Sequence, residues 1–540
     1  MKKTFTEKKA SIAQSPYGMV STASGIATDA GVKILEKGGN AVDAAVAAAF
    51  CLGVTEPHAS GIGGQSMVLL HLADSGSTIA LDGSSRAPFA VSPMHVPKKP
   101  LTIGLQASTV PSTPAVLGYL LEHYGKLTLQ EVLEPSIAAA RDGFKITALQ
   151  HRLIKLEAEE LRKDPLAANV FLKDGRPLHA GEILCQEELA SCLKRMADEG
   201  WQDFYHGEIG RKILDDMQSR GGQITEADLS QIPVPIERPF LETSYRDYTA
   251  RIYPPPGAGR ALGQILNILG NFHPEELQPG SPVAAVIMAL ATHSALQSRE
   301  RWPIDPAIYK QLRKRRMLHK DYAKEIARRI RMVLPPEGTK RFDLPETSGE
   351  TTHLSVADHQ GNAVGITQSI ELVFGCKRTA QGLGFFYNNY MSTFNYKDMT
   401  HPYYLLPGAF PWSSVAPTLI FKGRRPLFLL GSPGSERIAP TLAQVITGLI
   451  DAKQSLGDAV NNPRLHCTHK GTVHIEADRF HPDVLDALAQ AGLQVKKRAA
   501  YSFYLGCVQA VQLPEKKNKP FIGVADPRRD GRAGAPEFKS

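Results

Sequence analysis

Residues 351–375, TTHLSVADHQGNAVGITQSIELVFG, decide the fold of this chain. Polar and apolar residues alternate in each half of the stretch, and the turn-forming run His359–Asn362 separates the halves. The pattern predicts a β-hairpin whose first strand begins at Thr351. On the second strand Ser369 and Glu371 would share a polar face close to Thr351, while the apolar residues between them face a core.

The segment before the hairpin, residues 333–350, reads VLPPEGTKRFDLPETSGE. Its paired prolines, mixed charge and lack of periodicity predict an exposed linker that is open to cleavage. A cut between Glu350 and Thr351 would give Thr351 a free α-amine, whose near-neutral pKa lets it serve as the base for the hydroxyl of the same residue. The alternative is that Thr351 and Thr352 simply begin a strand, since threonine favours β-structure.

Composition describes an ordinary globular protein. The chain has 540 residues, 42% of them hydrophobic and 21% charged, and a length that suggests two or more lobes. No apolar run is long enough to span a membrane and no apolar leader follows the first basic residues, so a cytoplasmic location without membrane contact is expected. The six cysteines follow no regular framework, which is typical of reduced thiols.

Before the hairpin, the sequence predicts a buried helix, two strands and a long helical region. The Ala-rich stretch after Asn40 predicts a capped, buried helix, and residues 65–74 and 77–83 predict strands. The glycines at 61–64 precede a strand rather than a helix, which argues against a phosphate-binding loop. Residues from about 110 to 330 have mainly helical periodicity.

Two clusters suggest other functions, but neither is favoured. The net charge is +8, and many basic residues fall at helical spacing between Lys310 and Arg331. Because that run lacks interleaved aromatic residues, a solvated helix face is preferred to a nucleic-acid surface. His466, Cys467 and His469 lack a second pair of ligands, so no zinc site is expected.

Five blocks of sequence, in order, resemble γ-glutamyltransferase proenzymes, which are N-terminal-nucleophile hydrolases. They are GGNAVDAAVAAAFCLGVTEPHASGIGG (38–64), TTHLSVADHQGNAV (351–364), SSVAPTLI (413–420), GSPGSERI (431–438) and ADPRRDGRAG (525–534). The resemblance implies an α+β fold, a four-layer αββα sandwich built from two cleavage products. Residues 1–350 would form the large subunit, with its helical middle and the linker, and residues 351–540 the small subunit.

The resemblance also implies catalytic roles. Thr351 would be the nucleophile released by self-cleavage at Glu350–Thr351, Thr352 its supporting neighbour, and Ser369 the hydroxyl that hydrogen-bonds it. The backbone N–H groups of Gly434 and Ser435 would form the oxyanion hole, which stabilises the charge on the attacked carbonyl. Ser435 stands where the family has a second glycine.

The substrate pocket is where the chain departs from the family. Ser413 and Ser414 match the serine pair that binds a substrate carboxylate. Arg86 lies two places beyond the family's carboxylate-binding arginine; on a strand it would keep the same face and could still bind an anion, although a surface ion pair is an equal alternative.

Most of the residues with which the family binds a substrate ammonium are missing from this chain. Glu371, Tyr390 and Thr393 replace its usual residues, and only Glu371 could still pair with an ammonium. The segment between Asn395 and Pro411 is short, so no long lid is expected.

These features predict a self-cleaving N-terminal-threonine amidohydrolase that acts on a small anionic amide through an acyl-enzyme. Hydrolysis is expected ahead of acyl transfer, with γ-glutamyl, glutaryl (as in cephalosporin acylases) or oxamate-type donors all open. No cofactor, metal or nucleic-acid partner is expected; the two cleavage products should stay associated, with a homo-oligomer possible. The alternative from another class is an uncleaved, inactive relative that serves as a binding protein. Of Arg528, Arg529 and Arg532, one could assist anion binding, but solvent exposure is expected.

Overall fold

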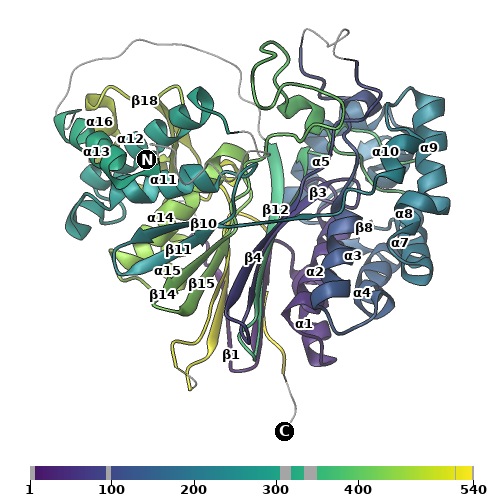
Figure 1. Ribbon diagram of the computed structural model, residues 1–540, viewed down its shortest axis with the longest axis horizontal. Coiled ribbons are helices and arrows are strands. Elements are labelled where there is room, and N and C mark those ends of the chain that lie inside the picture. The colour runs from purple at the N-terminus through teal and green to yellow at the C-terminus, as the bar shows by residue number, and fades with distance from the viewer. Residues whose placement is uncertain (1–6, 93–98, 305–317, 334–348, 517, 538–540) are drawn as a thin grey trace.

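Two stacked β-sheets form the centre of the computed structural model, which describes residues 7–92, 99–304, 318–333, 349–516 and 518–537 (Figure 1). The first sheet has the order β1 (Ser11–Ser15), β20 (Phe521–Ala525), β19 (Gln509–Gln512), β15 (Arg425–Gly431), β14 (Thr418–Lys422), β11 (Tyr248–Ile252) and β10 (Leu241–Tyr245). The second has the order β21 (Arg532–Gly534), β2 (Gly18–Thr22), β12 (Gly349–Asp358), β13 (Ala363–Leu372), β3 (Gln65–Leu72), β4 (Ser77–Gly83) and β9 (Ile236–Arg238).

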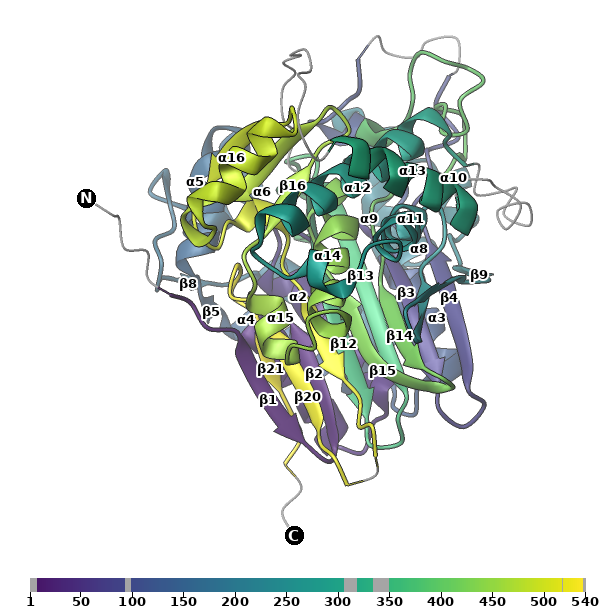
Figure 2. The same ribbon diagram turned by 90° about the vertical axis from the view of Figure 1, so that its left-hand side faces the viewer.

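Helices cover the outer face of each sheet. Over the second sheet lie α1 (Gly25–Glu36), α2 (Ala41–Thr55), α3 (Thr113–Tyr124), α4 (Leu129–Asp142), α5 (Ala148–Leu161), α6 (Pro165–Phe171), α7 (Glu187–Glu199), α8 (Asp203–His206), α9 (Glu208–Arg220) and α10 (Glu226–Ser230). Over the first lie α11 (Gly259–Leu269), α12 (Pro282–Arg301), α13 (Lys320–Val333), α14 (Ile438–Ile450), α15 (Leu456–Asn461) and α16 (Pro482–Gln490), several of which face the viewer in Figure 2. The small sheet β16 (Leu465–Cys467), β17 (Thr472–Glu476) and β18 (Gln494–Arg498) packs beside α12 and α16. The expected αββα layering is confirmed.

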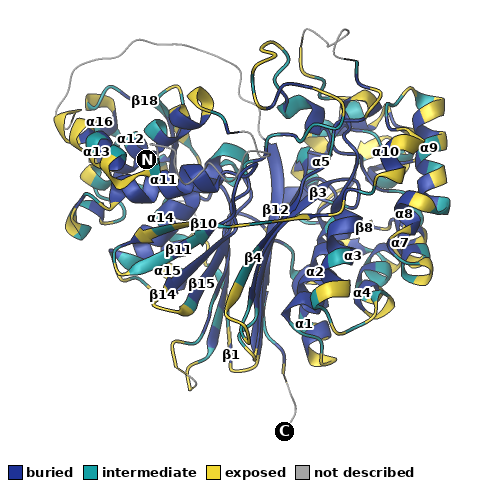
Figure 3. Cartoon of the chain, viewed as in Figure 1, coloured by how far each residue is buried: buried dark blue, intermediate teal, exposed yellow. Residues whose placement is uncertain are grey.

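Burial follows this layering. The central strands of both sheets are buried along most of their length, and exposed residues gather on the outer surfaces of the helices (Figure 3). Between the sheets, the fully buried side chains of Met19, Met67 and Leu429 belong to one apolar cluster. Because both faces of each sheet are covered, the polar groups placed between or at the ends of the strands are shielded from water.

Helix α2 illustrates how the sequence determines an element. The Asn40 side chain accepts hydrogen bonds from the amides of Val42 and Asp43, and the Asp43 carboxylate accepts one from the Asn40 amide. This capping box satisfies otherwise unpaired N–H groups. Alanine dominates the helix and nearly all of its residues are buried, as expected from its composition.

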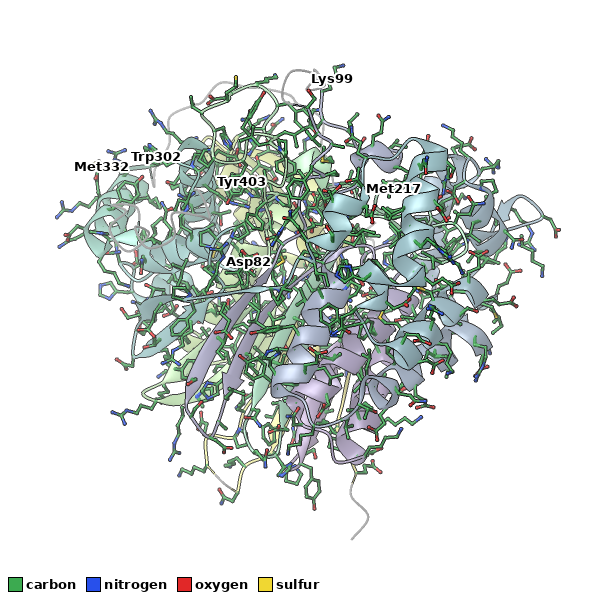
Figure 4. The ribbon with its side chains drawn as sticks, turned by 45° about the vertical axis from the view of Figure 1, so that its right-hand side comes forward. Asp82, Lys99, Met217, Trp302, Met332 and Tyr403 are labelled. Atoms are coloured by element: carbon green, nitrogen blue, oxygen red, sulfur yellow. The ribbon has the colours of Figure 1, made fainter. Side chains whose placement is uncertain are left out.

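The basic run at Lys310–Arg331 forms a surface helix where it is described; residues 310–317 lie outside the described residues. In α13, Ala323, Ile326 and Ile330 are buried, while the basic residues lie on the opposite side. Trp302 and Met332 are exposed near this edge of the molecule (Figure 4). None of the described helices has both the length and the apolar character needed to cross a bilayer.

The prediction of an exposed linker over residues 333–350 is wrong for its last two residues. Residues 334–348 lie outside the described residues, but Gly349 and Glu350 belong to β12 and are buried. They pair with Leu372 and Glu371 of β13. The hairpin therefore begins two residues earlier than predicted, and the Glu350–Thr351 peptide bond lies inside a strand.

Candidate active site

Thr351 occupies an irregularity in the β12–β13 ladder. Glu350 pairs with Glu371 and Thr352 with Gln368, so the register shifts at Thr351. Such a bulge turns a side chain out of its regular direction. The Thr351 hydroxyl lies 3.4 Å from Ser369 Oγ, and Ser369 Oγ donates a hydrogen bond of 2.6 Å to the carbonyl oxygen of Glu350. One serine therefore contacts both the predicted nucleophile and the carbonyl group that precedes it.

Thr352 points to the other side of the strand. Its hydroxyl donates a 2.5 Å hydrogen bond to Glu56 Oε2, and both residues are buried. Burial raises the pKa of Glu56 to about 7, although Arg529 and the Thr352 hydrogen bond favour its charged form. Glu56 was not among the predicted site residues, because nothing in the local sequence indicates that it reaches a strand almost three hundred positions away.

Gly434 and Ser435 form the turn that leads into α14. Gly434 has φ of 123° and Ser435 has φ of 52°, both in the left-handed region. A Cβ atom on Gly349 would lie 3.0 Å from the Cβ of Ser435, so this turn abuts the strand that carries the Glu350–Thr351 bond. Within the described residues neither of the two turn amides donates a hydrogen bond to another residue. Free amides near the start of a helix suit a developing negative charge.

Ser413 and Ser414 lie against an arginine that was not among the predicted site residues. Arg299 of α12 donates 2.6 Å to the carbonyl oxygen of Ser413 and 3.3 Å to the Ser414 hydroxyl, and its guanidinium lies 4.2 Å from the ring centroid of Trp412. Arg299 is buried and forms no ion pair with any described carboxylate. Burial lowers its pKa to about 10. The Ser413 hydroxyl is also buried and has no partner among the described residues.

Glu371 lies on the same side of the site. Its Oε1 would be 3.4 Å from a Cβ atom on Gly349. Burial raises the pKa of Glu371 to about 7, and the charges of Arg437 and Arg299 oppose this rise. The carboxyl group is therefore poised to change charge near neutral pH.

Tyr390 and Thr393 occupy the short helix Tyr390–Thr393. Burial raises the pKa of Tyr390, and the nearby side chains of Ser369 and Gln65 oppose this rise, which places Tyr390 close to the serine that contacts the predicted nucleophile. The Thr393 hydroxyl instead donates 2.9 Å to the carbonyl oxygen of Tyr390. Of the two, only Tyr390 is brought to Ser369.

Arg86 follows β4 rather than lying within it. The strand ends at Gly83, and Arg86 forms a single bridge with Val110. Arg86 therefore does not share a strand face with the position that the family's arginine occupies, two residues earlier. Its guanidinium lies 5.5 Å from the Phe410 ring, and its Nε atom has no partner among the described residues. Among the described residues Arg86 forms no surface ion pair either; the nearby carboxylate of Asp82 pairs with Arg238.

Two of the three C-terminal arginines are buried, contrary to the expected exposure. Arg528 forms ion pairs with Glu476 and Asp526, and Arg529 pairs with Glu350 at 2.8 Å; Arg532 alone is exposed. The buried carboxylates compensate the charges, and such long-range partners are invisible in local sequence.

The histidines near Cys467 face a carboxylate next to the Gly434 turn. His466 and His469 lie 3.9 and 3.8 Å from the Glu436 oxygens. The described ranges contain no group of three or more histidine, cysteine or acidic side chains that could hold a metal ion.

Similarity to known proteins extends over nearly the whole chain. The model of the family described as Gamma-glutamyltranspeptidase matches residues 27–535. The chain is 35% identical to the glutathione hydrolase proenzyme of Escherichia coli (strain K12), covering 95% of this chain and 90% of that protein. It is 37% identical to the acylase ACY 1 proenzyme of Pseudomonas sp. (strain V22), covering 88% and 87%.

Its structure resembles that of a cephalosporin acylase from Bacillus halodurans, with a TM-score of 0.89, 26% identity and coverage of 99% and 98% of the two chains. The family match, the relatives and the sandwich agree with one another. The chain belongs to the gamma-glutamyltranspeptidase family of N-terminal-nucleophile hydrolases.

Proposed function

We propose that the chain cleaves itself between Glu350 and Thr351 and then hydrolyses amides whose acyl group carries a carboxylate, with Thr351 as the nucleophile. The observation that carries the proposal is the position of Ser369, which contacts the Thr351 hydroxyl and donates to the Glu350 carbonyl oxygen. This contact polarises the carbonyl group next to the hydroxyl that would attack it.

Self-cleavage would proceed within two adjacent residues. Thr351 Oγ attacks the carbonyl carbon of Glu350, the C–N bond breaks, and the Thr351 nitrogen takes up the proton, which leaves an ester between the two residues. Water hydrolyses the ester to the Glu350 carboxylic acid and the free hydroxyl. Thr351 then begins a new chain and carries the α-amine that serves as its base.

In each later cycle the α-amine takes the proton from Thr351 Oγ as this oxygen attacks the substrate amide. The amides of Gly434 and Ser435 stabilise the tetrahedral oxyanion, and its collapse releases the amine product, which receives the proton. Water, activated by the same α-amine, then releases the acid from the acyl-enzyme.

The charge of the site supports an anionic donor. Arg299 is a buried cation without a described carboxylate partner, and it holds the serine pair that resembles a carboxylate-binding site. Glu371 is the only one of the family's replaced ammonium-binding positions that still carries an acid. Since its pKa is about 7, it is partly neutral at neutral pH. Glutaryl-type amides are therefore proposed ahead of γ-glutamyl amides, with oxamate third. Similarity to both glutathione hydrolases and acylases is compatible with this order.

The test combines measurement of the intact mass of the chain with assays of its amidase activity. The purified wild-type chain should resolve into two products that separate at residue 350, and Thr351→Ala should remain one inactive chain, while Thr351→Ser should cleave slowly. The wild type is then assayed with glutaryl, γ-glutamyl and oxamate amides. An active wild-type chain that stays intact would refute the proposal, and rapid turnover of γ-glutamyl amides alone would refute the proposed order of donors.

A further inference from the structure

Arg529 contacts the chain on both sides of the proposed cleavage point. Its Nη1 donates 3.0 Å to the carbonyl oxygen of Thr351, and its Nη2 donates 2.8 Å to Glu350 Oε2. The exposed fractions of the Arg529 and Glu350 side chains are only 1% and 2%. A single guanidinium thus holds the residue before the bond by its side chain and the residue after it by its backbone.

The surroundings of Arg529 keep this guanidinium in one place. Its plane lies against Phe503, with 4.3 Å between the guanidinium carbon and the ring centroid. Burial lowers the pKa of Arg529, but the carboxylates of Glu350 and Glu56 outweigh that effect and leave the pKa above its ordinary value. The planar fork of arginine suits this double contact, whereas a lysine ammonium could satisfy only part of it.

We propose that Arg529 is a positioning residue for self-cleavage, which aligns the Glu350–Thr351 peptide bond by holding Glu350 and Thr351 at the same time. The inference rests on the proposed self-cleavage. Ser369 holds the carbonyl oxygen of the same bond, so three contacts restrain the bond and its two flanking residues while Thr351 Oγ approaches the carbonyl carbon. Arg529 transfers no proton in this step; it restricts the geometry, which strongly affects the rate of an intramolecular attack.

The same contact has a second consequence after the cut. The Glu350 carboxylate is then no longer tied to Thr351 through the chain, but the carbonyl oxygen of Thr351 remains within reach of Arg529. Glu56, which accepts the Thr352 hydrogen bond, stays as a buried carboxylate near Arg529. Arg529 would therefore continue to anchor the first residues of the new chain.

The experiment measures the rate of self-cleavage in the full-length chain by intact mass. Arg529→Met should slow the cut by about a hundredfold, as expected for a misaligned intramolecular reaction. Arg529→Lys should recover part of the rate, and Glu350→Leu, which removes one of the two contacts, should also slow it. Arg532→Met is the matched control, because Arg532 is an exposed arginine of the same C-terminal run. It should cleave like the wild type.

A double variant separates alignment from folding. If Arg529 acts through Glu350, Arg529→Met with Glu350→Leu should be little slower than Arg529→Met alone. Each variant is also placed in a Thr351→Ala background, where no chain is cut, and its unfolding temperature is measured. Cleavage of Arg529→Met within about twofold of the wild type would overturn the inference, as would additive effects of the two substitutions. If the wild type itself is never cut, the proposed function fails instead.

Discussion

Glu371 has a half-buried side chain that lies within the influence of two cations, Arg437 and Arg299. Its pKa of about 7 means that the carboxyl group gains a negative charge as pH rises through neutrality. The ionised form attracts a substrate ammonium, and the neutral form avoids repelling a substrate that carries only a carboxylate.

We therefore expect the preference between donors to depend on pH. The ratio of kcat/KM for a γ-glutamyl amide to that for the matching glutaryl amide should rise from pH 5.5 to 8, by at most about tenfold per unit below the pKa of Glu371. The proposed α-amine of Thr351 would serve both substrates, so its titration would cancel in the ratio. Glu371→Gln should flatten the ratio, and a ratio already flat in the wild type would remove Glu371 from the donor pocket.

Arg299 leads to a second prediction for a single residue. Arg299→Met keeps much of the apolar stem but removes the cation from the serine pair, so KM for carboxylate-bearing amides should rise by about tenfold to a hundredfold. The rate of self-cleavage should change little, because Arg299 contacts Ser413 and Ser414 rather than Glu350. An unchanged KM would show that the serine pair binds its ligand without this cation.

For single residues of the site, the sequence could predict contacts within the β12–β13 hairpin and few others. The register of β12 and β13 brings Thr351 to Ser369, and that proximity was predictable from alternation and turn position. Glu56, Arg299 and Arg529 reach the site from α2's end, from α12 and from the C-terminal run. Such contacts depend on how elements pack, and no local pattern encodes them.

Among the elements, the turn before α14 is sensitive to substitution. A side chain at Gly434 would be strained at φ of 123°, and its Cβ would lie 3.3 Å from the Cα of Gly506. Gly434→Ala should therefore shift the two amides of the turn and lower kcat by about a hundredfold or more. Circular dichroism and the unfolding temperature of the variant check that the loss is local; full activity would exclude these amides as the oxyanion hole.

The cap of α2 gives a prediction for stability alone. Asn40→Ala removes the acceptor for two amides and the donor to the Tyr124 carbonyl oxygen. The free energy of unfolding should fall by about 1–2 kcal/mol, measured by denaturant titration of the Thr351→Ala chain. Asn40→Asp, which keeps the capping oxygen, serves as the comparison and should lose less.

Elements with strong local signals were predicted well. The helix after Asn40 and the strand at residues 77–83 have the predicted positions, and β3 ends two residues before its predicted limit. Arg86 shows the opposite case, because the strand was assumed to continue beyond Gly83. Nothing in the sequence alternation indicates that the chain instead turns to bridge Val110.

For the whole molecule, the order of the strands matters more than any single contact. Both sheets contain strands from before and from after the proposed cut. These strands pair with each other at β1–β20, β11–β14, β2–β21, β2–β12 and β3–β13. Periodicity could indicate strands at both ends of the chain and helices in its middle. The stacking and the interleaving came only from the family resemblance and the structure, because strand pairing over hundreds of residues leaves no local trace.

The interleaving predicts that the cleaved protein stays assembled. The two products should elute together in size-exclusion chromatography at any salt concentration that leaves the fold intact, and appear separately on a denaturing gel. Elution of either product alone under native conditions would contradict the shared sheets. Salt should have little effect because the contacts are mainly backbone hydrogen bonds and apolar packing, and an ion pair such as Arg529–Glu350 is buried, where salt screens weakly.

Strand β12 contains the proposed cleavage point near its start, and it lies between β2 and β13 in the middle of a sheet. β12 can pair with β2 and β13 while the polypeptide is still continuous, and sheet formation is then an intramolecular step. Once the bond is broken, regaining the same arrangement from the denatured state would be a bimolecular encounter that depends on concentration. The cleaved protein would therefore refold poorly. Heat would inactivate it irreversibly, whereas the uncut chain would refold on cooling.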